Sequence, residues 1–277
     1  MSDCVPAPVV RASCLARRHD ELAPGSRAIP EETPIAFTYG GSTHAVMMAT
    51  PADLEDFAAG FALTEGLIEA GAGPIEVEIV ASDFGVELRS WLPDLVQSQY
   101  SARKRSMAGP TGCGLCGIES LEQATREPPK VASAFRILAG DLIAAMDRLP
   151  AAQSLNRETR AVHGAAFWSP ATNGLILRED VGRHNALDKL AGALVRQRVS
   201  GQNGVVLMTS RVSVELVQKT ARIGAPIIAA ISAPTALAVR TAEACGMTLV
   251  AVMRGRDFEV FTHPERIVEQ APAHVVA

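Results

Sequence analysis

The chain has 277 residues, of which 48% are hydrophobic and only 4% aromatic, and its formal net charge is −4 from 26 basic and 30 acidic residues. A chain of this length can bury a substantial core in one large or two modest domains. The near balance of charge gives no overall attraction to nucleic acid or to a membrane surface. Five cysteines are too few, and odd in number, for a disulfide-stapled scaffold.

The sequence also carries no signal for export or membrane insertion. No charged-then-apolar leader opens it, and apolar runs such as residues 225–230 are much shorter than the ~20 residues that span a bilayer. We therefore expect a cytoplasmic protein whose thiols stay reduced.

The first 128 residues predict a small α+β unit behind a tail. Residues 1–30 mix Pro, Arg and Ala without periodicity, which predicts a mobile tail. Residues 33–50 predict a hairpin, because apolar residues stand on both sides of the turn-forming segment Tyr39-Gly40-Gly41-Ser42. Thr50-Pro51-Ala52-Asp53 predicts a helix start, and an apolar stripe continues that helix to about Ile68.

A second hairpin is predicted over residues 75–89, where Val and Ile alternate with charged residues. Glu127-Pro128-Pro129 then breaks the chain. The break predicts a boundary between an N-terminal subdomain, residues 31–128, and a C-terminal α/β domain, residues 129–277.

The C-terminal domain alternates short apolar strands with helical segments. This alternation predicts right-handed crossovers and a mostly parallel sheet between two layers of helices. The predicted helices cover residues 135–148, 184–198, 213–223 and 235–244, and the strands cover 162–168, 175–178, 204–209, 226–231, 247–253 and 258–261.

Two thiols three positions apart are the most informative local feature. Cys113 and Cys116 lie within residues 109–117, which contain four glycines, so the backbone there can approach a bound partner closely. A short helix is predicted over residues 118–126, and thiols just before a helix N-terminus are shifted toward the reactive thiolate. Arg103-Lys104-Arg105 would act in the same direction if it folds nearby.

Pairs at this spacing serve zinc binding, disulfide exchange or sulfur relay. A zinc site needs two further ligands, and His163 and His184 are single and distant in sequence. The His-x-Glu of zinc deaminases is absent. Gly112-x-Gly114-x-x-Gly117 matches a dinucleotide fingerprint by letters, but no buried strand precedes it. We therefore predict no metal site.

Three loops of the C-terminal domain follow predicted strands and carry polar side chains. In an open parallel sheet such loops line one crevice, where ligands bind. Their hydroxyls, arginines and helix N-termini suit an anionic ligand such as a pyrophosphate. Alternatively, Ser210, Ser213 and Thr235 only cap helices, Asp180 pairs with an arginine, and Glu215 and Lys219 form a surface pair. The loops are residues 178–185, 209–213 and 232–235.

Several long segments resemble the formate dehydrogenase accessory sulfurtransferase (FdhD/NarQ) family, over about residues 33–263 and in the family's order. They are Thr50-Pro-Ala-Asp-Leu-Glu-Asp-Phe, Gly60-Phe-Ala-Leu-Thr-Glu-Gly-Leu-Ile68, Cys113-Gly-Leu-Cys-Gly-Ile-Glu-Ser-Leu-Glu122, Arg178-Glu-Asp-Val-Gly-Arg-His-Asn-Ala-Leu-Asp-Lys189, Glu215-Leu-Val-Gln-Lys219, Ala230-Ile-Ser-Ala-Pro-Thr-Ala-Leu-Ala238 and Arg254-Gly. Thr209-Ser210-Arg211 departs from the Ser-Gly-Arg of many members.

The resemblance implies a sulfur carrier. Family members take sulfane sulfur from a cysteine desulfurase and pass it to the molybdenum (or tungsten) bis-guanine-dinucleotide pterin cofactor, Mo-bis(molybdopterin guanine dinucleotide), which formate dehydrogenase requires. The implied fold is a cytidine-deaminase-like three-layer α/β/α domain without the deaminase zinc, together with a smaller β-containing subdomain, and members form homodimers.

The resemblance also implies roles for individual residues. Cys113 corresponds to the persulfide-bearing position and Cys116 to its companion thiol. The family's cofactor contact near the C-terminus, together with two residues of the strand-end loops, yields the predicted cofactor-binding set of Phe258, Glu259, Val260, Phe261, Thr262, His263, Arg211 and Ser232. The alternative hypothesis is a chaperone that binds and inserts the cofactor without sulfur chemistry.

Overall fold

The computed structural model describes residues 4–71, 73, 75–92, 127–170 and 174–269. Cys113, Cys116, the basic cluster at 103–105 and the predicted helix over 118–126 lie outside the described residues. None of the helices within these ranges is both long and apolar enough to cross a membrane.

A six-stranded sheet forms the centre of the C-terminal domain. Its strand order is β13-β12-β11-β10-β8-β9. Only β10, β11 and β12 run parallel to one another, and the other three strands pair antiparallel. The strands are β8 (His163–Trp168), β9 (Leu175–Asp180), β10 (Val205–Met208), β11 (Ile227–Ala230), β12 (Thr248–Arg254) and β13 (Asp257–Thr262).

The prediction of a mostly parallel sheet is therefore wrong for its outer strands. The connections from β8 to β9 and from β12 to β13 are too short for a crossover, so each pair folds back as a hairpin. Gly255, with a φ of 59°, turns the chain between β12 and β13.

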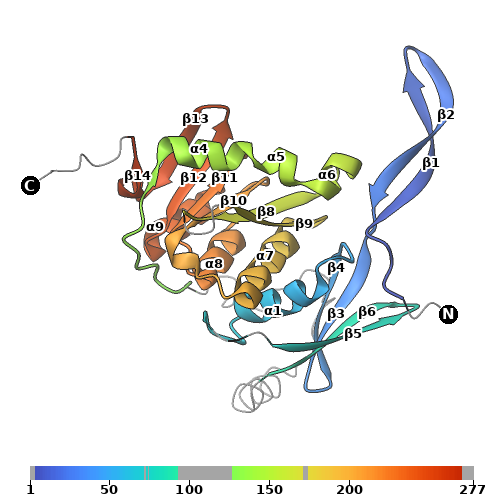
Figure 1. The fold of residues 1–277 in the computed structure, drawn as a ribbon, viewed down its shortest axis with the longest axis horizontal. Helices are drawn as coiled ribbons and strands as arrows, with labels where there is room; N and C mark the ends of the chain where they lie inside the picture. Colours follow the sequence, from blue (N-terminus) through green and yellow to red (C-terminus); the bar gives the residue numbers. More distant parts are fainter. Residues whose placement is uncertain (1–3, 72, 74, 93–126, 171–173, 270–277) are drawn as a thin grey trace, which may run out of the picture.

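Two helical layers cover the sheet, which confirms the three-layer α/β/α class (Figure 1). Along β10, Val206 and Met208 face α7, α8 and α9, whereas Val205 and Leu207 face α4 and α5. All four side chains are fully buried because both faces of the sheet are covered. The helices are α4 (Ala139–Asp147), α5 (Leu149–Ala152), α6 (Ser154–Thr159), α7 (Arg183–Gln197), α8 (Val214–Ile223) and α9 (Ala236–Cys245).

Short elements complete this domain. β7 and β14 form a two-stranded parallel sheet, and one turn of 3-10 helix precedes each of β10 and β14. They are β7 (Ile137–Leu138), β14 (Ile267–Val268), η1 (Gly201–Asn203) and η2 (Pro264–Arg266).

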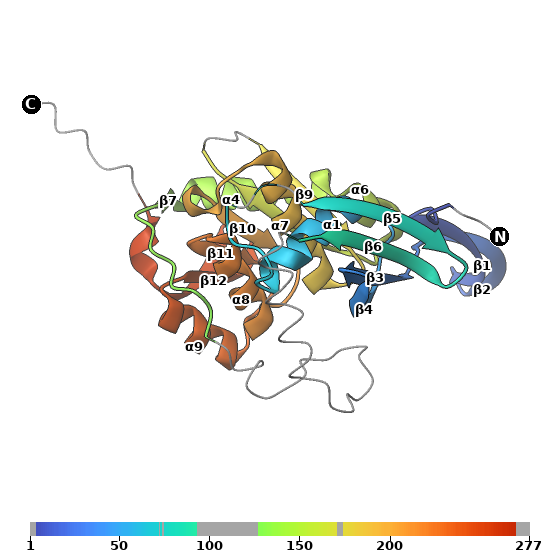
Figure 2. The ribbon, with the colours of Figure 1, turned by 90° about the horizontal axis from the view of Figure 1, so that it is seen from below.

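A four-stranded sheet of order β4-β3-β6-β5 forms the smaller subdomain. Both predicted hairpins are confirmed, and β3 pairs in parallel with β6 between them. Figure 2 shows this sheet and the N-terminal hairpin at the end of the molecule opposite β12 and α9. Its elements are β3 (Thr33–Tyr39), β4 (Ser42–Ala49), α1 (Leu54–Thr64), β5 (Glu76–Ser82) and β6 (Gly85–Trp91).

Aromatic packing holds α1 against the four-stranded sheet. The ring of Phe37 stacks on Phe61 at 4.0 Å between centroids and meets the edge of Phe57 at 4.9 Å. The helix begins at Leu54, with Asp53 before it, and the Thr50 hydroxyl instead accepts a hydrogen bond from the Val181 N–H at 3.2 Å. Thr50 thus joins the two domains and does not cap the helix.

The N-terminal residues correct the predicted tail. β1 (Val9–Arg18) pairs with β2 (Glu21–Pro30) along its whole length as an antiparallel hairpin. His19 and Asp20 form the two-residue turn, and both have positive φ, as the favoured hairpin turns require. The pair lacks the glycine that usually indicates such a turn, so the hairpin had no clear sequence signal.

The backbones of α1 and α7 touch where two glycines cross. A Cβ atom on Gly60 would lie 1.6 Å from the Asp188 carbonyl oxygen, and one on Gly192 would lie 1.7 Å from the Asp56 carbonyl oxygen. Neither contact tolerates a side chain. This crossing fixes the smaller subdomain against the C-terminal domain.

We predict that Gly60→Ala lowers the free energy of unfolding by about 2 kcal/mol or more, because the methyl group must push two helices apart. Urea unfolding followed by circular dichroism measures the change. Gly140→Ala is the matched control: this glycine also lies in a helix, but a Cβ there meets nothing within 4 Å. The control should be neutral or stabilising by up to about 1 kcal/mol. Equal effects of both substitutions would contradict the close crossing.

Candidate functional site

Most of the motif over residues 178–189 serves to hold the fold together. The buried carboxylate of Asp180 accepts hydrogen bonds from Lys189 Nζ at 2.6 Å, from the Gly182 N–H at 2.7 Å and from Asn185 Nδ2 at 2.9 Å. Lys189 also donates to the Thr50 carbonyl oxygen at 2.8 Å. These bonds fix the end of β9, the start of α7 and the chain before α1. Asp180 therefore pairs with a lysine and not with an arginine.

The two residues before Asp180 bind other elements. Arg178 Nε donates a hydrogen bond to Asp56 of α1 at 2.7 Å, and it forms an ion pair with Asp53 at 3.4 Å. The carboxylate of Glu179 accepts from the Leu155 and Asn156 N–H groups at 2.9 Å each. These N–H groups belong to the first turn of α6, so Glu179 satisfies donors that the helix itself leaves free.

A second buried ion pair lies between α7 and α8. Lys219 Nζ donates to the two oxygens of Asp188 at 2.7 and 2.9 Å, and Thr64 donates to the same carboxylate at 2.6 Å. Burial raises the pKa of Asp188, and the adjacent ammonium opposes that rise. The predicted surface pair between Glu215 and Lys219 is therefore wrong, since Lys219 points into the core toward Asp188.

Glu215 instead joins a group of polar residues at the starts of α7 and α8. Its Oε2 atom accepts from Ser213 Oγ at 2.8 Å and lies 3.2 Å from His184 Nε2. His184 Nε2 also lies 3.3 Å from Ser213 Oγ. The hydrogen bond from His184 lowers the pKa of Glu215 to about 2. The hydrogen bond from Ser213 acts in the same sense, whereas burial acts to raise this pKa. Glu215 is thus ionised under all physiological conditions.

Two further residues lie at the same ends of the strands in the large sheet, beside the starts of α7 and α8. Arg183 is the first residue of α7, and its buried Nε has no hydrogen-bond partner among the described residues. His163 is the first residue of β8, directly opposite Asp180 in the strand pairing. Burial, Arg183 and His184 lower the pKa of His163, while Asp180 has the opposite effect. We call His163, Arg183, His184, Ser213 and Glu215 the strand-end cluster.

The predicted residues Arg211 and Ser232 lie at this edge as well. Val212 bridges to Pro234 in parallel, and the Thr235 N–H donates to the Val212 carbonyl oxygen at 2.9 Å, so the two loops run side by side. Of the hydroxyls proposed as helix caps, only that of Thr235 acts so, accepting from the Ala238 N–H at 3.2 Å.

The other predicted cofactor-binding residues occupy β13 and the residue after it. Phe258 and Val260 pack against the core, while Phe261 is 39% exposed and Glu259 points to solvent. The Thr262 hydroxyl donates to the Met247 carbonyl oxygen at 2.7 Å and accepts from the Leu249 N–H at 2.9 Å.

The structure therefore spreads the predicted cofactor-binding residues over two ends of the sheet. Thr262 pairs with Leu249 at the start of β12, whereas Ser232 follows the end of β11, which is parallel to β12. His263, whose Nε2 lies 3.0 Å from the Glu243 carbonyl oxygen, is at the far end from Arg211 and Ser232. Any ligand touching both groups has to extend along β12 and β13.

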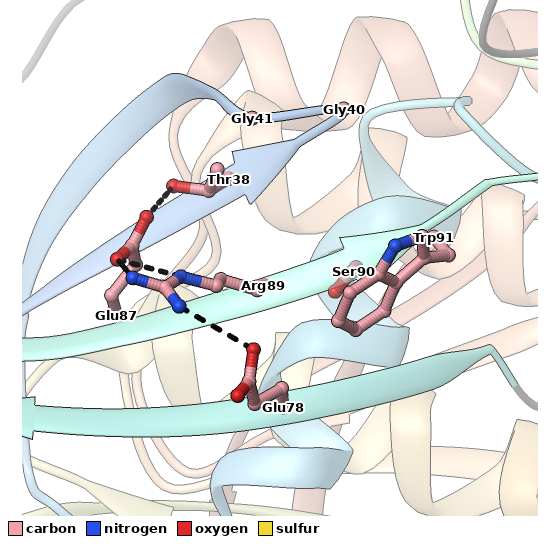
Figure 3. Close-up of a pocket in the computed structure, with 8 residues that line it drawn as sticks. All are labelled: Thr38, Gly40, Gly41, Glu78, Glu87, Arg89, Ser90 and Trp91. Carbon is pink, nitrogen blue, oxygen red and sulfur yellow. Dashed lines mark hydrogen bonds and ion pairs between the residues drawn. The ribbon is translucent and has the colours of Figure 1, made fainter.

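A hollow of about 430 Å³ lies elsewhere, on the outer face of the four-stranded sheet (Figure 3). Arg89 crosses it and pairs with Glu87 at 2.9 Å and with Glu78 at 3.5 Å. Because two carboxylates already surround its one guanidinium, this hollow is poorly suited to an anionic ligand. It is lined by Thr38, Gly40, Gly41, Glu78, Glu87, Arg89, Ser90 and Trp91.

No group of three or more His, Cys, Asp or Glu residues is arranged to hold a metal ion in the described part of the chain. The prediction of no metal site remains untested, because Cys113 and Cys116 lie outside that part.

Comparison with known proteins decides the family. Residues 30–268 match the model of the FdhD/NarQ family. The chain belongs to this family. It is 56% identical over 259 residues to a sulfur carrier protein FdhD of Agrobacterium fabrum, covering 93% of this chain and 96% of that one. It is 50% identical to a protein of the same name from Brucella abortus, over 92% of this chain and 95% of the relative.

A solved structure agrees with this assignment to the FdhD/NarQ family. The crystal structure of a formate dehydrogenase accessory protein from Desulfotalea psychrophila superimposes with a TM-score of 0.74 at 27% identity, over 95% of this chain and 100% of that chain. The family resemblance predicted from the sequence is thus confirmed.

The predicted crevice of three strand-end loops already contains Arg183, His184 and Ser213, but it does not include His163 or Glu215. His163, His184 and Ser213 read singly as buried polar residues or caps. The position of these loops directly after predicted strands is the sequence signal for Arg183, His184 and Ser213, whereas nothing in the sequence connects His163 with them.

We predict that Glu215→Gln removes a pH-dependent contribution to stability. Because the pKa of Glu215 is lowered from 4.5 to about 2, its contribution is present above pH 4.5 and is lost as the pH falls toward 2. The wild type should exceed the variant by no more than about 1 kcal/mol near neutral pH, since the side chain is 35% exposed and solvent screens the pair.

Urea unfolding at a series of pH values tests this prediction. The gap between wild type and variant should close on acidification. Glu158→Gln, at an exposed carboxylate on α6, is the control and should keep a constant gap. A Glu215→Gln gap that does not change with pH would show that His184 does not stabilise the ionised carboxylate.

Proposed function

We propose that this protein carries sulfur as a persulfide on Cys113 and passes it to the molybdenum bis-guanine-dinucleotide pterin cofactor of a formate dehydrogenase. The observation that carries the proposal is membership of the FdhD/NarQ family, with close relatives named as sulfur carriers, in a chain that has the Cys113-x-x-Cys116 pair. The sulfur donor in this proposal is a cysteine desulfurase, and the site of action is the cytoplasm.

The chemistry of the transfer follows from thiol reactivity. The Cys113 thiolate attacks the outer sulfur of the donor persulfide, and the donor cysteine leaves as its thiolate. Cys113 then holds the extra sulfur. Attack of the Cys116 thiolate on Cys113 Sγ releases hydrosulfide for the metal of the cofactor and leaves a Cys113–Cys116 disulfide, which a cellular thiol reduces.

The described cysteines support the choice of Cys113. Burial raises the pKa of the Cys245 thiol, which disfavours the nucleophilic thiolate. Cys4 and Cys14 are exposed near the N-terminus, and Cys14 belongs to the β1–β2 hairpin. Neither has a second cysteine three positions away.

The sheet edge supports binding of the acceptor. The guanine-dinucleotide cofactor carries phosphate groups, and arginine side chains and helix N-termini are common phosphate ligands. The exposed Arg211 forms no ion pair with a described carboxylate, and Ser232 lies on the neighbouring loop. The predicted cofactor-binding residues extend from Arg211 and Ser232 to β13, which is consistent with an elongated ligand. In this proposal the protein is a homodimer with one such site on each subunit.

We predict that incubation with a cysteine desulfurase and cysteine adds about 32 Da to the protein, the mass of one sulfur atom. Intact-mass spectrometry without reductant measures the adduct, and peptide mapping should place it on Cys113. Cys113→Ala should lose the adduct, whereas Cys14→Ala, at an exposed single thiol, should keep it. An undiminished adduct on Cys113→Ala would rule out the assignment.

We also predict that Cys113→Ala fails to restore formate dehydrogenase activity in cells that lack their own FdhD/NarQ protein, while Cys14→Ala restores it. Activity per unit of formate dehydrogenase protein is the measurement, with equal expression checked by immunoblot. Full activity with Cys113→Ala would instead support a chaperone that binds the cofactor without transferring sulfur.

A further inference from the structure

One arginine of the strand-end cluster, Arg183, forms no ion pair or hydrogen bond with its side chain among the described residues. The buried Nε of Arg183 finds no acceptor among the described residues, and no described carboxylate forms an ion pair with its guanidinium. Arg178 and Arg196, in contrast, both pair with Asp56, at 2.5 and 2.7 Å. A buried donor without an acceptor is destabilising, so the position of Arg183 favours an acceptor from a ligand.

The residues around Arg183 are oriented to add further donors. Glu215 holds His184 through Nε2, at 3.2 Å, and no described residue is bonded to the other ring nitrogen, Nδ1. A proton placed on Nε2 by this contact leaves Nδ1 able to bind a second proton and then to donate. His163 lies at the start of β8, directly opposite Asp180 in the strand pairing, and Asp180 is followed two residues later by the start of α7 at Gly182-Arg183.

The backbone also favours a negatively charged ligand at this cluster. α7 has 15 residues and α8 has 10, and both begin at this cluster, so the positive ends of two helix dipoles face the same region. Ser213, the residue before α8, makes no capping bond with its side chain. Two carboxylates are nearby, but Asp180 is neutralised by Lys189, and Glu215 is engaged with His184 and Ser213.

We propose that His163, Arg183, His184 and Ser213 form a binding site for a tetrahedral oxyanion, namely one phosphate group of the dinucleotide acceptor. The identity of the ligand rests on the proposed function, but the oxyanion site does not. Protonation of either histidine makes the cluster net positive, because the charges of Arg183 and Glu215 cancel. Binding is therefore stronger at low pH.

Sulfate is the probe for this site, since its charge stays constant over the pH range in which histidine titrates. The full-length protein is titrated with sodium sulfate, and sodium chloride at matched ionic strength serves as the blank. The ring signals of the six histidines are followed by ¹H–¹⁵N correlation NMR and assigned with His163→Gln and His184→Gln. The signals of His163 and His184 should shift in a saturable manner, with an affinity that falls as the pH rises through the histidine range.

Arg183→Gln should weaken sulfate binding about tenfold or more, the loss expected for one charge-assisted contact. It removes no hydrogen bond between described residues, so we expect it to fold, as a thermal melt will show. Arg148→Gln is the control, because it makes the same charge change at an exposed position beyond the opposite face of the sheet.

Several results would overturn the site. These are unshifted His163 and His184 signals, equal losses in Arg183→Gln and Arg148→Gln, or binding that strengthens as the pH rises. The persulfide measurement on Cys113 is independent of sulfate binding. A missing sulfur adduct with intact sulfate binding would contradict the sulfur-carrier function alone. A sulfur adduct on Cys113 without sulfate binding would contradict only the oxyanion site.

Discussion

Direct contact between the backbones of α1 and α7 is the constraint on which the rest of this structure depends. Gly60 of α1 lies against the carbonyl group of Asp188 in α7, and Gly192 of α7 lies against the carbonyl group of Asp56 in α1. The side chains of Asp56 and Asp188 are both buried carboxylates. The close approach therefore brings acidic side chains into the core, and cations from other elements must neutralise them.

Those cations join the parts of the protein. Lys219 reaches Asp188 from α8, and Arg178 reaches Asp56 from β9, while Lys189 neutralises Asp180 within the same motif. Breaking such a pair leaves a lone buried charge, which is far more costly than the pair itself is worth. The network thus makes the two domains depend on each other, and it holds the starts of α7 and α8 in place beside the ends of the strands.

This rigid frame explains why the strand-end cluster can serve as a binding site. Its residues do not share in the buried pairs, although they adjoin them in sequence. Asp180 and Lys189 satisfy each other, whereas Arg183 lies between them in the chain with a buried nitrogen that has no acceptor among the described residues. Within one motif, then, most residues maintain the fold and a few are left for a ligand. Under the proposed function, this fixed site would hold the acceptor while the thiol meets its two partners in turn.

The sequence by itself determined the family, the three-layer class and most elements, because hydrophobic periodicity acts locally. The helix expected over residues 213–223, for example, is α8 (Val214–Ile223). Long motifs likewise identified the FdhD/NarQ family without any structure. Only the tertiary structure decided the direction of the outer strands, the N-terminal hairpin, the partner of Lys219, and the position of His163 opposite Asp180. The N-terminal hairpin is local, but its His19-Asp20 turn lacks the glycine that would have indicated it. The partner of Lys219 and the position of His163 depend on contacts between residues far apart in the chain, and such contacts leave no local pattern in a single sequence.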